Sequence, residues 1–166
     1  MSLQNILAAV PTDAQSEIIK MDAFLKPLRP LKFKRTTDKR KINYVSPDYG
    51  ISYAIFPLDP EPTQQFGWYF LYDKEAKKWY RKTDYFGETL AEIKKIDPES
   101  ARRIFDAIND CASCKGNPCS AIPYAHEGAQ KLACYGRIVL RLRRDDFNDV
   151  QAFFRHLNML VEEKIE

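Results

Sequence analysis

The sequence predicts an α+β domain in which a mainly antiparallel sheet of hairpins is covered by N-terminal, central and C-terminal helices. Its 166 residues, 45% of them hydrophobic, are enough to close one core. The apolar residues repeat with helical spacing in some segments and with a period of two in others, and most period-two segments follow one another directly. This order favours hairpins over strand-helix-strand crossovers. We therefore expect residues 1–166 to form one domain, with residues 1–11 a disordered or vector-derived extension.

An amphipathic helix is expected near the N-terminal end. Thr12 and Gln15 have the spacing of a capping box, and Pro27 ends the helical pattern. The apolar stripe of this helix consists of Ile18, Met21, Phe24 and Leu25.

About five strands are expected to follow. Apolar and polar residues alternate over Leu31–Lys34 and again over Ile42–Tyr44. The segment Gly50–Leu58 is apolar on both faces, which is typical of a central strand. Two aromatic runs flank the polar segment Asp73–Lys78, which predicts a hairpin with a longer loop.

Three further helices are expected. One lies around Glu88–Ile96, and the next begins where Asp97 provides a cap and Pro98 takes the first turn. Its buried residues are predicted to be Ala101, Ile104, Phe105 and Ile108. The last helix is capped by Asp145 or Asp146. Its apolar stripe is Phe147, Val150, Phe154, Leu157 and Val161.

Between the central and final helices, the sequence predicts a hairpin that turns near Gly128. Its second arm alternates over Leu132–Leu142, as expected for a strand with one buried face. The residues predicted to point inward are Leu132, Cys134, Gly136, Ile138, Leu140 and Leu142, and those predicted to point outward are Arg137, Arg141 and Arg143.

The four cysteines predict a structural zinc site made by Cys111, Cys114, Cys119 and Cys134. The first three follow a C-x2-C-x4-C spacing, in which a tight turn lets two sulfurs face one point. We prefer Cys134 over His126 as the fourth ligand, because an extended arm carries His126 away from Cys119. Four thiolates would saturate the zinc ion and leave no position for a catalytic water. The alternatives are an iron–sulfur cluster, free thiols packed in the core, and a disulfide or redox pair.

Catalysis is the less favoured function class. The sequence lacks the common nucleophile, zinc-protease, phosphate-loop and dinucleotide motifs. Its two histidines are predicted to be surface residues, His126 near a turn and partly exposed His156 on the last helix.

The aromatic strands suggest the binding of a small ligand or a protein partner. A curved antiparallel sheet covered by helices can present a concave aromatic face to such a partner. The predicted contact residues are Trp68, Phe70, Tyr72 and Tyr53. Ordinary core packing is the alternative, because aromatic residues at strand period are usually buried.

Binding of single-stranded nucleic acid is the alternative function. Basic residues cluster in two segments and are interleaved with aromatic residues, a pattern that suits such a ligand. They are Lys26, Arg29, Lys32, Lys34, Arg35, Lys39, Arg40 and Lys41 in one segment, and Lys77, Lys78, Arg81 and Lys82 in the other. The net charge of only +3 argues against it, and lysines that protect an edge strand would give the same pattern.

A cytoplasmic location without membrane association is expected. The first residues lack a basic region, and the apolar run Ile6–Val10 is too short for a signal-peptide core or a membrane span. In a reducing compartment, cysteines are more often free thiols or metal ligands than disulfides.

Overall fold

The computed structural model of the chain describes residues 1–59, 63–68, 71–73, 78–80, 85–111, 121–133, 137–142 and 146–164. The helices are α1 (Leu3–Leu7), α2 (Thr12–Leu25), the short 3-10 helix η1 (Pro47–Tyr49), α3 (Tyr85–Ile96), α4 (Pro98–Ala107) and α5 (Phe147–Glu163). The strands are β1 (Lys34–Thr37), β2 (Ile42–Ser46), β3 (Ile51–Phe56), β4 (Thr63–Trp68), β5 (Leu71–Asp73), β6 (Lys78–Tyr80), β7 (Ile122–His126), β8 (Ala129–Ala133) and β9 (Arg137–Leu140).

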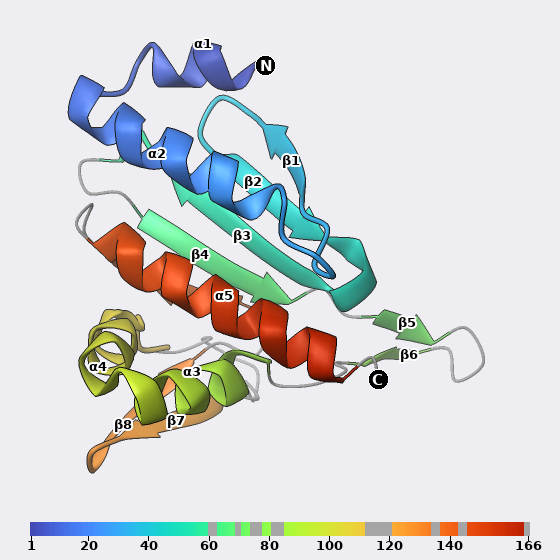
Figure 1. Cartoon of the computed structure of the whole chain (residues 1–166), viewed down its shortest axis with the longest axis vertical. Coiled ribbons are helices and arrows are strands. Elements are labelled where there is room, and N and C mark those ends of the chain that lie inside the picture. Colours follow the sequence, from blue (N-terminus) through green and yellow to red (C-terminus); the bar gives the residue numbers. More distant parts are fainter. Residues whose placement is uncertain are drawn as a thin grey trace.

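The predicted α+β class is confirmed. A five-stranded antiparallel sheet has the order β1-β2-β3-β4-β9, and β5-β6 and β7-β8 form two separate hairpins. The helices α2 and α5 run side by side across one face of the five-stranded sheet, while α3, α4 and the β7-β8 hairpin lie at one end of the molecule (Figure 1). The apolar segment that predicted a central strand is β3, which lies in the middle of this sheet.

The core lies between the five-stranded sheet and the helices α2 and α5. The inward side chains, each at most 2% exposed, are Ile42, Tyr44, Ile51, Tyr53, Ile55, Phe66, Ile138 and Leu140. The ring of Phe154 on α5 lies 5.0 Å from that of Tyr53 and 5.2 Å from that of Phe66. Such edge-to-face and stacked aromatic pairs are favourable beyond the area they bury. This packing fixes α5 along the sheet.

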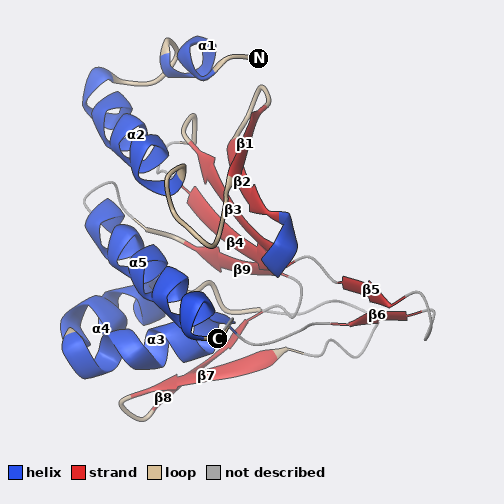
Figure 2. Ribbon diagram, turned by 45° about the vertical axis from the view of Figure 1, so that its right-hand side comes forward, coloured by secondary structure: helices blue, strands red, loops and turns tan. Residues whose placement is uncertain are grey.

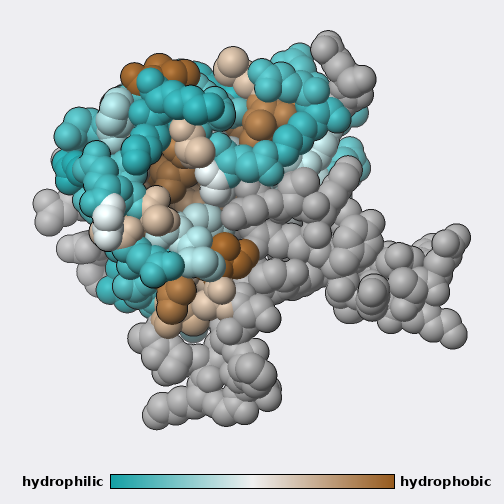
Figure 3. Space-filling view, turned by 90° about the horizontal axis from the view of Figure 1, so that it is seen from below, coloured by the Kyte–Doolittle hydropathy of each residue, from teal (hydrophilic) through white to brown (hydrophobic). Residues whose placement is uncertain are grey.

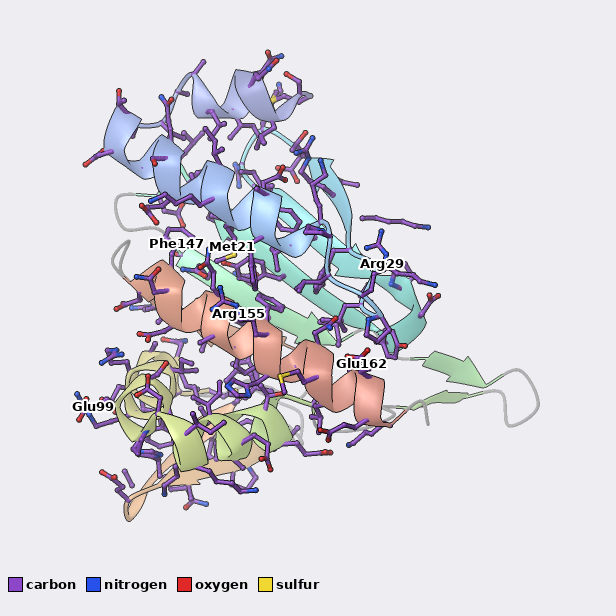
Figure 4. The ribbon with its side chains drawn as sticks, in the orientation of Figure 1. Met21, Arg29, Glu99, Phe147, Arg155 and Glu162 are labelled. Atoms are coloured by element: carbon purple, nitrogen blue, oxygen red, sulfur yellow. The ribbon has the colours of Figure 1, made fainter. Side chains whose placement is uncertain are left out.

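Side-chain contacts also join α2 to α5. Arg155 of α5 places its guanidinium 5.2 Å from the ring centroid of Phe24 on α2, and Met21 of α2 is fully buried (Figure 4). The opposite face of the sheet carries smaller or polar residues, such as half-buried Ser52 and Gln65. In Figure 2, α2 and α5 both lie on the same side of the sheet.

Residues 107–111 connect the five-stranded sheet to the β7-β8 hairpin. The amide of Asn109 donates to the carbonyl of Val139 on β9 at 2.9 Å. The amide of Cys111 then donates to the carbonyl of Leu132 on β8 at 2.7 Å. The hairpin is therefore held against the rest of the fold by backbone hydrogen bonds as well as by side chains.

The helix predictions are mostly confirmed, with differences at the ends. Asp97 caps α4 as predicted, since its side chain accepts a hydrogen bond from the amide of Ser100 at 3.0 Å. The capping box expected at Thr12 is wrong, because α2 already begins at Thr12 and Pro11 occupies the cap position without a side-chain hydrogen bond. Asp146 occupies the cap position of α5, also without a side-chain capping bond.

Part of the segment 1–11 is ordered, where the sequence suggested disorder as one alternative. Residues Leu3–Leu7 form α1, and Ser2 caps it by accepting a hydrogen bond from the amide of Asn5. Ile6 and Val10 are each only 3% exposed, so they belong to the core. Burial of these two apolar side chains accounts for the order.

The final hairpin differs from its prediction. The turn near Gly128 is confirmed, but the predicted second arm is divided between β8 and β9, which lie in different sheets. Leu132 was predicted to point inward and is 45% exposed, whereas Ala133 is buried. Ile138, Leu140 and Leu142 are buried as predicted. The buried position in β8 thus has an odd residue number, and those in β9 have even numbers. One alternating pattern over the whole segment cannot predict this change.

No helix within the described ranges is long and apolar enough to span a membrane.

Candidate functional site

A groove of about 430 Å³ lies between α3 and β7. We call it the α3–β7 groove, and its lining residues are Gly87, Leu90, Ala91 and Lys94 of α3 with Pro123, Tyr124, Ala125 and His126 of β7. Its volume falls in the range of small-molecule sites in proteins. The described surface at this end of the molecule mixes apolar with hydrophilic residues (Figure 3).

One face of α3 forms the first wall of the groove. The four lining residues of α3 follow the i, i+3, i+4, i+7 spacing that places side chains on one side of a helix. Glu88 in the first turn and Lys94 and Lys95 in the last turn suit the helix dipole. The ring of Phe86 contacts that of Tyr124 edge-to-face, with centroids 5.3 Å apart, and this contact fixes α3 against β7.

The edge of β7 forms the second wall. Successive residues of a strand point to opposite faces of its sheet, so a cavity that touches only one face meets alternate residues. The groove instead meets four consecutive residues, Pro123 to His126. We infer that the groove runs along the backbone edge of β7.

The turn of the hairpin determines which backbone groups lie at that edge. Glu127 and Gly128 form a two-residue turn in which both have positive φ, 48° and 82°, as in a type I′ turn. In such a hairpin the flanking pair, His126 and Ala129, exchanges hydrogen bonds, and bonded pairs then alternate along the strands. Ala125 therefore directs its amide N–H and its carbonyl away from β8.

His126 is buried where the sequence predicted an exposed residue. It is 5% exposed, and its ring stacks on that of Phe105 with centroids 5.4 Å apart. Its Nε2 atom has no hydrogen-bond partner among the described residues, and the nearest carboxylate oxygen, on Glu127, is 3.8 Å away. A buried ring nitrogen without a partner is unusual. The sequence did contain a signal for this burial. Tyr124 and His126 are two residues apart, so in a strand their side chains lie on the same face, which is buried here.

Lys94 provides a cation at the groove. It is exposed and forms no ion pair with any residue in the described ranges. The next residue, Lys95, does not line the groove and instead pairs with Glu92 at 2.6 Å. The groove thus combines the apolar side chain of Leu90 with a cation that has no ion pair in the described residues. The other histidine, His156, is half-buried on α5, as predicted.

The predicted aromatic site is only partly described. Tyr53 is fully buried in the core, where its hydroxyl donates to the Oε1 atom of Gln64 and burial raises its pKa well above the usual value. This position supports the core-packing alternative for Tyr53. Phe70 and the side chains of Trp68 and Tyr72 lie outside the described part of the chain. The backbone hairpin predicted there is confirmed, since Tyr72 pairs with Trp79.

The predicted zinc ligands are also only partly described. Cys111 is a half-buried free thiol, and Cys114, Cys119 and Cys134 lie outside the described residues. Within the described residues, no three His, Cys, Asp or Glu side chains gather closely enough to hold a metal ion. The amide of Cys111 donates to the carbonyl of Leu132.

In the basic segment 26–41, some basic side chains bind an acidic or carbonyl group of the chain and others do not. Arg35 binds Asp22 at 2.7 and 2.8 Å, and Lys26 lies 3.8 Å from the same carboxylate. Arg29 donates to two nearby carbonyls. The basic side chains of this segment that form neither an ion pair nor a side-chain hydrogen bond with a described residue are Lys32, Lys34, Lys39, Arg40 and Lys41. They lie on β1 or next to it. Lys77, Arg81, Lys82 and the side chain of Lys78 lie outside the described residues.

Comparison of the chain with protein-family models, with curated proteins and with solved structures found no match.

Proposed function

We propose that this chain is a binding domain that takes a small ligand or a protein partner in the α3–β7 groove. The observation that carries the proposal is the lining of the groove, which includes Leu90, Lys94 and His126, the last of which has a buried Nε2 atom without a hydrogen-bond partner in the described residues. Leaving such a group unsatisfied costs about 1–3 kcal/mol, which a ligand atom bonded to it would recover. The aromatic contacts of Trp68, Phe70 and Tyr72 stay a prediction, so the groove is the site that the described residues support best.

Protein-observed NMR tests the groove directly. The ¹⁵N-labelled protein is titrated with a fragment set of carboxylic acids, amides, amines and heteroaromatic rings. We expect amide shifts to concentrate at Leu90, Ala91, Ala125 and His126. The variant Ala91→Trp fills the groove from an exposed position of α3 and should abolish these shifts. Lys95→Trp adds the same bulk at an exposed residue of α3 that does not line the groove and should keep them. Groove amides that no fragment shifts would refute a small-ligand site in the groove, and fragments that bind Ala91→Trp equally well would show that they bind elsewhere.

We also propose that Cys111, Cys114, Cys119 and Cys134 hold a structural zinc ion in a cytoplasmic protein. The described residues on either side of the segment 112–120, which contains Cys114 and Cys119, are held at neighbouring points. Cys111 is bonded to Leu132, and Ile122 pairs with Ala133. Cys134 follows Ala133 in the chain, so its Cα atom is only about 3.8 Å from that of Ala133. The described residues that flank these cysteines in the chain thus lie near the end of β8, which supports the proposal because a tetrahedral site requires its ligands to converge.

Elemental analysis with a thiol titration tests the metal. We expect one zinc ion per chain and four thiols that react only after the protein is unfolded or treated with a chelator. Bound iron with acid-labile sulfide would indicate a cluster in place of zinc. Metal-free protein whose thiols all react at once would rule out the site.

Binding of single-stranded nucleic acid is the second candidate. It is favoured by the five basic side chains on and beside β1 that have no ion pair with a described residue, because these are available to phosphate groups. A filter-binding assay with single-stranded oligonucleotides over a salt series tests it. Phosphate contacts predict a steep loss of affinity with salt, reduced by Lys39→Glu with Arg40→Glu and unchanged by Lys95→Glu. No retention at low salt would eliminate this candidate.

A further inference from the structure

We infer that the partner taken by the α3–β7 groove is an extended peptide that adds a strand to the edge of β7 and places a carboxylate at Lys94. This inference rests on the proposed function, because it names the chemistry of the partner for the same groove. Strand addition to an exposed edge is a common way of recognising extended peptides, with backbone hydrogen bonds giving affinity and side-chain pockets giving specificity.

The backbone groups at the edge of β7 suit a short added strand. The hairpin register directs the N–H and the carbonyl of Ala125 away from β8, and it directs the carbonyl of Pro123 the same way. Proline has no N–H, and this is why it is tolerated at a strand edge. An incoming peptide could therefore exchange two hydrogen bonds with Ala125 and donate one to Pro123.

The partner strand β8 confirms this alternation. Leu132 lies opposite Pro123 and likewise directs its backbone groups away from the hairpin. Its amide donates to the side chain of Asp110 at 2.8 Å, and its carbonyl accepts from the amide of Cys111 at 2.7 Å. At Leu132, the outer edge of β8 is thus bonded to the chain itself. Among the described residues, nothing bonds to the corresponding groups of Ala125 on the edge of β7.

The α3 wall leaves room for the side chains of an added strand. Gly87 has no side chain and Ala91 has only a methyl group, so the helix surface is low opposite the strand edge. Leu90 is 6% exposed and provides an apolar floor. Alternate side chains of an extended peptide point to the same face, and every second one would pack on this floor. A compact small molecule could occupy the groove but would not form the row of backbone hydrogen bonds that an extended peptide forms with the edge of β7.

The charge at the groove selects a peptide that carries a carboxylate. Lys94 is a groove-lining cation with no acidic partner among the described residues. A carboxylate there would form a charge-assisted hydrogen bond, and His126 also lines the groove. The carboxylate could belong to an aspartate or glutamate side chain or to the C-terminus of the peptide.

A peptide array tests the inference. Random-sequence octapeptides are presented either with a free C-terminal carboxylate or with an amidated C-terminus, and each set is made with and without acidic residues. We expect binding to the sets that contain a carboxylate. If the protein prefers peptides with a free C-terminus, the C-terminal carboxylate is the group that binds Lys94. If it binds amidated peptides that contain acidic residues, a side-chain carboxylate is that group. Equal binding to peptides without any carboxylate would overturn the role of Lys94.

Two variants of the full chain separate strand addition from other binding. Ala125→Pro removes the N–H at the edge of β7 without removing a hydrogen bond to β8. The fold should therefore persist, because β7 already contains a proline, Pro123, two residues earlier. We expect this variant to lose binding of the selected peptide, while Ala125→Ser keeps it. Full affinity in folded Ala125→Pro overturns strand addition.

A second pair of variants tests the carboxylate. Lys94→Ala should weaken binding of the selected acidic peptide at least about tenfold, whereas Lys95→Ala should not.

The outcomes distinguish this inference from the proposed function. If fragments shift the groove amides but no array peptide binds, the peptide inference fails and the groove remains a small-ligand site. If neither fragments nor peptides bind the groove, both fail.

Discussion

At the scale of single residues, a buried polar cluster fixes the relation between α2 and the sheet. The Asp22 carboxylate on α2 is 8% exposed and accepts hydrogen bonds from Arg35 at 2.7 and 2.8 Å and from the Tyr44 hydroxyl at 2.9 Å. A buried carboxylate is tolerated because these donors replace its hydration. The same residues therefore depend strongly on one another.

We predict that Asp22→Ala destabilises the fold by about 3 kcal/mol, because it leaves the Arg35 guanidinium and the Tyr44 hydroxyl without their partner. Urea denaturation followed by circular dichroism measures this loss. Lys26→Ala is the control, since Lys26 is half exposed and lies 3.8 Å from the same carboxylate, so its removal should change stability by less than about 1 kcal/mol. Equal effects of the two substitutions would contradict this account of the cluster.

Stability should fall at high pH because of the buried tyrosines. Burial, together with the negative charge of Asp22, raises the pKa of Tyr44 far above its ordinary value, and burial also raises that of Tyr53. A raised folded-state pKa contributes stability that is complete below the unfolded value of about 10 and is lost as pH rises above it. Each phenol can contribute a slope of at most about 1.4 kcal/mol per pH unit. Urea midpoints at pH 9 and 11 should therefore differ less in Tyr44→Phe than in the unmodified chain; identical slopes would contradict the prediction.

At the scale of elements, the turn between β7 and β8 determines which backbone groups meet the groove. Gly128 has φ of 82° and open space around the position of a Cβ atom. The two positive φ values match the right-handed twist of the strands, and that turn sets the register of the pair. The turn therefore controls the direction of the Ala125 amide as well as the stability of the hairpin.

We predict that Gly128→Ala destabilises the protein by about 1 kcal/mol or slightly more, because a methyl group disfavours this backbone conformation. The surroundings cannot explain the loss, since nothing lies within 4 Å of the added atom. Glu127→Gly is the matched substitution and should be neutral or mildly stabilising, since Glu127 has φ of 48°. Thermal denaturation of both variants measures the difference. A fully stable Gly128→Ala would imply a different turn.

The individual elements were largely predictable because their apolar periods are local. The α4 helix is an example, since Asp97, Pro98 and the buried stripe ending at Phe105 all occur where the sequence indicates. The division of β8 from β9 was not predictable, because it depends on which strands each segment pairs with. The exposure of Leu132 follows from that pairing and not from its own local pattern.

At the scale of the whole molecule, the candidate site was less predictable than the fold. His126 was expected at the surface because it precedes a turn, and it is buried because α4 places Phe105 against its ring. The groove requires α3 and β7, which are separated by the 25 residues 97–121, to meet. A single sequence shows no periodic signal for such a meeting. The net charge and the aromatic content likewise could not tell a binding surface from a core.

The proposed zinc ion should stabilise the connection between the two parts of the fold. Residues 107–111 link β9 to β8, and Cys111 ends that link. We predict that chelation lowers the thermal midpoint and increases hydrogen exchange in β7 and β8 more than in β3 and β4. Cys114→Ser should reproduce the effect without a chelator. Unchanged exchange in the hairpin after removal of bound metal would contradict this structural role.

The central claim is that β7 presents an open backbone edge to the α3–β7 groove, and amide hydrogen exchange of the free protein measures it most directly. We predict that the Ala125 amide exchanges rapidly while those of Tyr124 and His126, which face β8, are protected. An Ala125 amide as protected as its two neighbours would show that the edge is already covered, and would contradict the account.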